Sequence, residues 1–472
     1  MRIGLITSAF LFAYGIPLLA QEPPIPPPGQ DDAQRRAQEQ EKLREMEKLE
    51  FYGESIDHFY FDYGAWLRPG WFSYHDGTGS EISQTDYDIR LWLDLRYGAH
   101  QLYARMVTDY SSYASGDGPD GDDHDFESPH GDVLFYQVQL GELLGEPDRT
   151  WDLTARAGRQ YVAVGTGLVF NNIADGLTLR GNVGSVPFDL FALRLRTHAD
   201  DIDLSRPNPD ESKRYFFGGT LRYSGIVDQL PYLSVVIERD ELEESPENEF
   251  QDYQFNAEYF GLGIQGKITD GLYYDFEGWY QTGERFAHLA TDTPERVEAF
   301  AAVASLEYQF YTRTRPSLNL GVMFGSGDED RYRILNTEFG NQIETDDKAF
   351  LGFGYIPTGY TLAPYLSNLW ILHLGGSFNP FLEKKMGSVP LDSFEVALDF
   401  YYYRKHHKEG GISDPFADFE HAEIGYAGDL SLTWDIFSDI TFLARGGTFL
   451  PGAAYDTNDP RYYVSFSMLF SF

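Results

Sequence analysis

Residues 86–98 read DYDIRLWLDLRYG, a stretch in which apolar and mostly charged side chains alternate without a break. The apolar set is Tyr87, Ile89, Leu91, Leu93, Leu95 and Tyr97. The other set is Asp86, Asp88, Arg90, Trp92, Asp94 and Arg96. Because a strand places successive side chains on opposite faces, this pattern predicts a strand with one apolar face and one charged face. About ten residues is also the length that a tilted strand needs to cross a bilayer.

Similar segments recur along most of the chain. They are 59–74, 101–113, 131–141, 150–162, 187–198, 214–224, 231–239, 251–267, 272–284, 299–312, 317–325, 369–379, 393–405, 422–435, 439–449 and 460–472. We therefore predict an all-β fold, a transmembrane antiparallel β-barrel of about 18 strands, with 16 possible. A soluble β-sandwich would produce similar alternation. The lack of a helical interlude, and aromatic residues at the ends of apolar faces such as Tyr215 and Tyr223, favour the membrane barrel.

The connections between these segments differ in length. Long acidic stretches at 115–131, 238–252 and 326–347 contrast with short turns at 268–271 and 435–439. In outer-membrane barrels the long loops face the outside and the short turns face the periplasm. We expect the same division here.

The chain ends in PRYYVSFSMLFSF, residues 460–472, with Val464, Phe466, Met468, Phe470 and Phe472 on one parity. Backbone groups in lipid must all be paired, so we expect this last strand to pair with the first, near 59–74, and to close the barrel. An alternating apolar strand with a terminal Phe also resembles the signal recognised by the machinery that assembles bacterial outer-membrane barrels. We expect that machinery and outer-membrane lipids to be partners of the chain.

Composition excludes several classes of protein. The chain has 472 residues, 16% of them aromatic, no Cys, and a formal net charge of -38. That charge argues against binding nucleic acid, which requires a basic surface, and without Cys no disulfide can form. The adjacent histidines of RKHHK (404–408) would point to opposite faces of a strand. We predict no cofactor, no metal site and no catalytic residues.

The N-terminal residues indicate export from the cytoplasm. Residues 1–20 combine Arg2, an apolar run and Ala20, which predicts a signal peptide. Residues 21–55 are first Pro-rich and then charged and helix-forming, which predicts a short periplasmic extension. The expected organisation is signal peptide 1–20, extension 21–55 and barrel 56–472, in the bacterial outer membrane.

Arginines on the charged parity are the candidate site residues. A charge facing lipid at mid-bilayer costs about 2–4 kcal/mol, so these side chains belong in the lumen, which in a barrel of this size is expected to hold water. They could form ion pairs that stiffen the wall, or a lining that selects anionic solutes. On this argument the predicted pore-lining residues are Arg90, Arg96, Arg105, Arg156, Arg194, Arg196, Arg214 and Arg222.

The stretch RAGRQYVAVGTGLVFNNIADGLTLRG, residues 156–181, resembles the alginate export family of outer-membrane porins. The matching residues are Gly158, Arg159, Gln160, Gly165, Gly167, Asn171 or Asn172, Asp175 and Gly176. Residues 421–455 and, more weakly, 362–381 are also similar to that family. The resemblance implies a monomeric barrel of 18 strands with a basic constriction that passes an anionic polysaccharide. It also implies that Arg159 and Asp175 line the pore.

Together these features predict an outer-membrane pore or exporter rather than an enzyme. Hydrophilic solutes, such as anionic oligosaccharides, would cross by passive diffusion through a charged lumen. The alternative is a structural or adhesin-type barrel that is plugged by its own loops.

Overall fold

The structure is a computed structural model that describes residues 56–77, 79, 81–114, 123–144, 150–196, 199–207, 211–242, 250–387 and 389–472. The predicted signal peptide and extension, residues 1–55, lie outside the described residues. In the described part of the chain, no helix is long and apolar enough to span a membrane.

Eighteen antiparallel strands form one closed sheet. They are β1(Ile56–His75), β2(Glu81–Gly98), β3(His100–Tyr113), β4(His124–Gln139), β5(Trp151–Val164), β6(Phe170–Val183), β7(Val186–Leu195), β8(Arg214–Arg222), β9(Gln229–Asp240), β10(Phe255–Thr269), β11(Leu272–Arg285), β12(Glu295–Gln309), β13(Ser317–Gly325), β14(Leu369–Phe378), β17(Glu395–Lys405), β18(Glu423–Phe437), β19(Ile440–Pro451) and β20(Arg461–Ser471). A two-stranded hairpin of β15(Lys385–Met386) and β16(Val389–Pro390) and the short helix α2(Leu140–Leu143) lie in connections. The predicted transmembrane barrel of about 18 strands is confirmed.

The first and last strands close the barrel, as predicted. β1 pairs with β2 on one edge and with β20 on the other. The backbone N–H of Phe472 donates to Ala65 O at 2.9 Å, and the N–H of Ala65 donates to Phe472 O at 3.2 Å. On the outer face, Trp71 stacks on Phe466 with ring centroids 5.8 Å apart. The apolar parity of 460–472 therefore faces outward, toward lipid.

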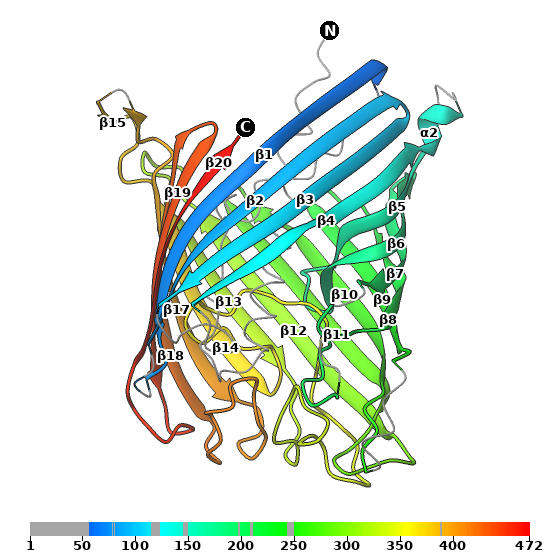
Figure 1. Cartoon of the computed structure of the whole chain (residues 1–472), viewed down its shortest axis with the longest axis vertical. Helices are drawn as coiled ribbons and strands as arrows, with labels where there is room; N and C mark the ends of the chain where they lie inside the picture. The colour runs from blue at the N-terminus through cyan, green and yellow to red at the C-terminus, as the bar shows by residue number, and fades with distance from the viewer. Residues whose placement is uncertain are drawn as a thin grey trace.

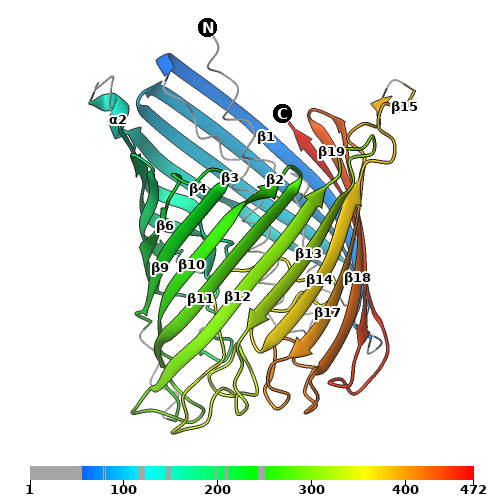
Figure 2. The same ribbon diagram turned by 180° about the vertical axis from the view of Figure 1, so that it is seen from behind.

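The connections divide into a long set and a short set, at opposite ends of the barrel. Figure 1 places the start of β1 and the end of β20 at one end and most of the long connections at the other, and Figure 2 shows β10–β14, β17 and β18 on the opposite wall. Strand alternation puts the turns 270–271 and 438–439 at the same end as the start of β1, and it puts the end of β9, the start of β10 and the loop 326–368 at the opposite end. We assign the end with the long loops to the outside.

In β2 the predicted faces are correct. Leu91 is 55% exposed, whereas Arg90 beside it is buried on the inner face. The segment that forms β6, residues 170–183, is absent from the predicted strands. Asn171, Asn172, Asp175 and Gly176 interrupt its alternation, so its local sequence does not read as a membrane strand.

Candidate functional site

The barrel wall is interrupted between β4 and β5. β4 pairs with β5 only over Leu134–Gln139, although β4 begins ten residues earlier, at His124. Gly158 lies where the two strands separate. Its φ of +129° is one that residues with a side chain rarely adopt, and a Cβ at this position would overlap Leu134 O. A glycine at this position allows β5 to bend sharply away from β4.

Beyond this bend, the hairpin of β5 and β6 folds into the lumen. Tyr161 and Ile173 are cross-strand partners on the hairpin, and both are buried. They pack in one cluster with Tyr103, Val133 and Phe135, which lie on the inner face of β3 and β4. The side chains of the hairpin that would face lipid in a regular barrel strand pack instead against the inner surface of β3 and β4. The hairpin therefore occupies the interior.

The tip of this hairpin, residues 165–169, is fixed to the far wall by Glu277 of β11. The carboxylate of Glu277 is fully buried and accepts four hydrogen bonds. Thr166 donates its backbone N–H at 2.9 Å and its hydroxyl at 2.6 Å. Tyr232 Oη and Trp279 Nε1 each donate at 2.7 Å. Gly165 has a φ of +59°, and a Cβ there would overlap the carboxylate.

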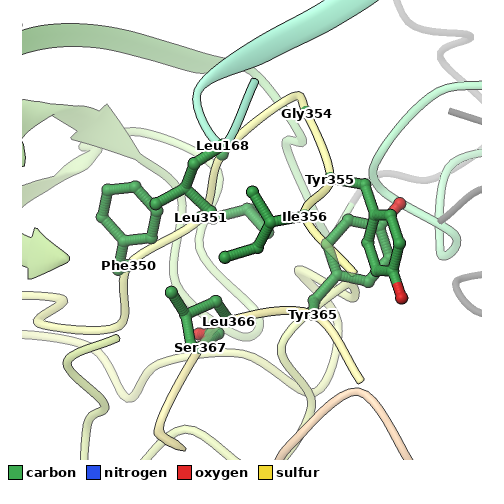
Figure 3. A pocket seen from close by; sticks show the side chains of 10 residues that line it. Leu168, Phe350, Leu351, Gly354, Tyr355, Ile356, Tyr365, Leu366 and Ser367 are labelled. Atoms are coloured by element: carbon green, nitrogen blue, oxygen red, sulfur yellow. The ribbon is translucent and has the colours of Figure 1, made fainter. Parts of the chain in front are cut away.

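The β13–β14 loop, residues 326–368, enters the interior and meets the same tip. Phe353 donates its N–H to Val169 O at 2.9 Å. Leu168 of the tip points toward Leu351 and Ile356 in a small pocket with mostly apolar walls (Figure 3). Because no charged side chain lines this pocket, it is a packing contact between the two segments rather than a site for an ionic solute.

A third segment, residues 199–206 between β7 and β8, covers Arg214 of β8. Arg214 donates to Asp201 at 2.8 Å and 3.0 Å and to Glu238 at 2.8 Å, and all three side chains are buried. Burial alone would raise the pKa of Asp201, but the guanidiniums of Arg214 and Arg206 lower it below its usual value. Arg214 faces inward as predicted, but its ion pairs and the covering segment bury it.

Predicted arginines on β2–β5 form a ladder along the inner wall. Arg90 donates to Asp88 at 2.8 Å, and Arg96 donates to Asp94 at 2.8 Å. Arg105 donates to Asp132 at 2.9 Å. Arg156 donates to Gln137 at 3.0 Å, with its guanidinium 4.0 Å from the ring centre of Phe135. These four arginines are buried on the inner face, where ion pairs and amide contacts hold them in fixed positions.

Two more predicted arginines lie outside this ladder. Arg222 faces inward on β8 and forms an ion pair with Asp189, which Arg180 also contacts at 2.7 Å. Arg196, the first residue after β7, is half-buried.

Arg159, Asp175 and Arg194 lie on the outer parity of their strands, not on the predicted inner parity. Arg159 lies opposite Leu134, which is 55% exposed on the outer surface. Asp175 lies opposite both arginines. On β7 the inner parity carries apolar Phe191, Leu193 and Leu195, which pack on the interior segments. Polarity alone predicts that Arg194 of β7 faces the lumen and that the apolar residues of β7 face lipid. The structure shows the reverse, because the interior beside β7 is a packed core rather than water.

The sequence also left the constricting residues unassigned. Glu277 lies within the predicted strand 272–284, but alternation identifies no partner for it, and the apolar stretch 348–366 lies between two predicted strands. A long loop with this many apolar residues is a signal of burial that could have identified it. The pairing of residues 165–169 with a loop about 180 residues away has no local signal.

A family model for alginate export matches residues 77–466. The chain belongs to the alginate export family. No curated protein matches this member of the family. The fold is similar to that of Pseudomonas aeruginosa OccK8 (OprE), with 10% identity, a TM-score of 0.51, and coverage of 87% of this chain and 98% of that chain. Acinetobacter baumannii OccAB1 has 11% identity and a TM-score of 0.51, with coverage of 87% and 96%. This member of the alginate export family is thus a β-barrel channel of the bacterial outer membrane.

Another similar structure is that of Pseudomonas aeruginosa OccK2 (OpdF) in complex with glucuronate. It has 11% identity and a TM-score of 0.50, and the match covers 87% of this chain and 96% of that chain. At this identity the likeness establishes the fold alone.

Proposed function

We propose that this channel passes anionic saccharides by passive diffusion, along the arginine ladder of β2–β5 and past the inward hairpin of β5 and β6. The observation that carries the proposal is the position of Arg156. It lies on β5, the strand that bends inward, and its guanidinium donates to Gln137 Oε1 at 3.0 Å and 3.1 Å. Fixed guanidiniums recognise carboxylates through paired hydrogen bonds, which suits uronate-type sugars.

Family membership and fold support the same solute class. The family model concerns alginate export, and OccK2, a barrel of the same fold, binds glucuronate. Alginate and glucuronate are both acidic saccharides. On the opposite wall, buried carboxylates such as Asp275, Glu277 and Glu307 face inward. Fixed guanidiniums on one wall, opposite buried carboxylates on the other, would orient a charged sugar as it crosses.

The test is ion selectivity in planar bilayers. With a salt gradient across the membrane, the reversal potential of the purified barrel should indicate preference for anions, and glucuronate oligomers should block the current. Cation preference, with no block by these oligomers, would contradict the proposal.

A second candidate function is a structural barrel closed by its own loops. The observation in its favour is the interior core, in which Phe170, Phe216, Phe350 and Phe353 are buried together. The same measurement distinguishes the two functions, because a structural barrel that is folded and inserted would give no single-channel steps.

A further inference from the structure

A row of charged and aromatic residues crosses the outer surface from β5 to β9. We call it the outer charged row, and it consists of Arg159, Asp175, Arg194, Tyr215 and Arg239. Each member is the cross-strand partner of the next: Arg159 with Asp175, Asp175 with Arg194, Arg194 with Tyr215, and Tyr215 with Arg239. Direct cross-strand partners share a face of the sheet, so the row is continuous.

On β7–β9 this row faces outward, and Arg159 and Asp175 continue it onto the root of the inward hairpin. On β7, Leu190 shares the parity of Arg194 and is 43% exposed, whereas Leu193 on the opposite parity is 2% exposed. On β8, Phe217 shares the parity of Tyr215 and is exposed, whereas Phe216 is buried in the interior core.

The row also lies close to the outer end of the barrel. Arg194 is the next-to-last residue of β7, Tyr215 is the second residue of β8, and Arg239 is the next-to-last residue of β9. All three therefore adjoin the connections that we assign to the outside. Outward-facing residues at this height meet the headgroups of the outer leaflet.

The row contains three arginines and one carboxylate, Asp175, although the whole chain carries a net charge of -38. Asp175 accepts two hydrogen bonds from Arg159, at 2.8 Å and 3.0 Å. Arg239 pairs with Glu258 at 2.5 Å. Arg194 instead lies over the ring of Tyr215 at 5.7 Å, and its Nε has no hydrogen-bond partner among the described residues.

We propose that the outer charged row binds the phosphate groups of a phosphorylated glycolipid in the outer leaflet. Arg194 is the central contact, with Arg239 two strands away at the same end of the barrel. A guanidinium presents a planar fork of donors that matches phosphate geometry, and its stacking on Tyr215 fixes that fork at headgroup height. Placement at the outer end selects a lipid of that leaflet, and the local excess of arginine selects a multiply charged headgroup.

The experiment measures thermal unfolding of the purified full-length barrel in detergent, titrated with diphosphoryl lipid A. The unfolding temperature of the wild-type protein should rise with lipid concentration. In the Arg194→Gln/Arg239→Gln variant, half-maximal stabilisation should need a lipid concentration that is higher by about fivefold per arginine removed. The matched control is Arg222→Gln, which removes an inward-facing arginine of the same wall and should leave the titration unchanged.

Three results would overturn the proposal: an unaltered titration of the double variant, equal stabilisation by lipid A stripped of its phosphates, or equal stabilisation by phosphatidylglycerol. The last result would identify the row as a general anionic-lipid contact. If the double variant does not fold, Arg194→Gln alone serves, because Arg194 Nε has no hydrogen-bond partner among the described residues and its guanidinium rests on Tyr215. That variant should show the single-arginine shift.

Discussion

The wall of β1–β4 and the neighbouring wall of β5–β7 follow different rules. In β1 and β2 the register continues over most of both strands, and charged side chains face the interior. In β5–β7 the hairpin of β5 and β6 bends into the lumen, the inner parity of β7 is apolar, and Arg194 lies on its outer parity. The difference shows that alternating polarity identifies the lipid-facing and lumen-facing side chains only where a strand separates lipid from water. Where loops fill the interior, an apolar side chain can belong to the inside.

The largest expected effect comes from displacing the hairpin that creates this difference. In Gly165→Ala, the new Cβ would overlap the Glu277 carboxylate and push the tip away from β11. We expect single-channel conductance to rise by about twofold or more, because the narrowest section widens. The matched control is Gly184→Ala, which has the same φ of +59° but open space around the new Cβ. Equal conductance changes in both variants would mean that backbone strain, not the tip, is responsible.

A second prediction removes the attachment itself. Glu277→Ala leaves the hydroxyl of Tyr232 and the indole N–H of Trp279 without their acceptor. Hydrogen bonds to a charged group contribute about 1.5–3 kcal/mol each, so the thermal unfolding temperature should fall and open-channel noise should increase. Glu307→Ala removes another buried inward carboxylate, on the adjacent β12, and serves as the control. A quiet channel in Glu277→Ala would show that the tip is held by the loop alone.

A third prediction compares arginines that the sequence grouped together. Arg156→Gln should lower the anion-to-cation permeability ratio by about twofold, because it removes a fixed inward charge. Arg194→Gln should leave the ratio unchanged, because Arg194 lies on the outer surface. Reversal potentials in a salt gradient measure both. If Arg194→Gln shifts the reversal potential as much as Arg156→Gln, the assignment of faces on β7 is incorrect.

Part of this fold can be predicted from the alternation of apolar and polar residues in the sequence. Every barrel strand except β6, the closure of the barrel, and the faces of β2 and β20 followed from alternation, because each residue there meets lipid or the interior according to parity alone. The positions of Arg159, Asp175 and Arg194 did not follow, because they depend on the bend at Gly158 and on a core formed with a distant loop. Contacts between residues far apart in sequence leave no periodic pattern.

The smallest expected effect concerns the pH response of the interior loop. Burial and the hydrogen bond with Asp328 raise the pKa of Asp330 to about 6. A raised carboxyl pKa means that the folded loop binds the proton more tightly than the unfolded chain, whose pKa is near 3.9. The stabilisation is therefore complete below about pH 4 and is lost as the pH rises through about 6.

Asp330→Asn should remove this dependence. Hydrogen exchange of the amides in residues 326–347, measured between pH 4 and pH 7 and corrected for the intrinsic pH dependence of exchange, would show it. In the wild type the protection of these amides should fall as the pH rises, and in the variant it should stay constant. The same decline in the variant would remove Asp330 as the responsible group.

The most direct test of the account is single-channel recording of the wild-type barrel beside Gly165→Ala, with a salt gradient across a planar bilayer. The account predicts small, anion-preferring steps for the wild type and larger, less selective steps for the variant, because the hairpin and the arginine wall together form the constriction. Steps of equal size and equal reversal potential in the two proteins would contradict it.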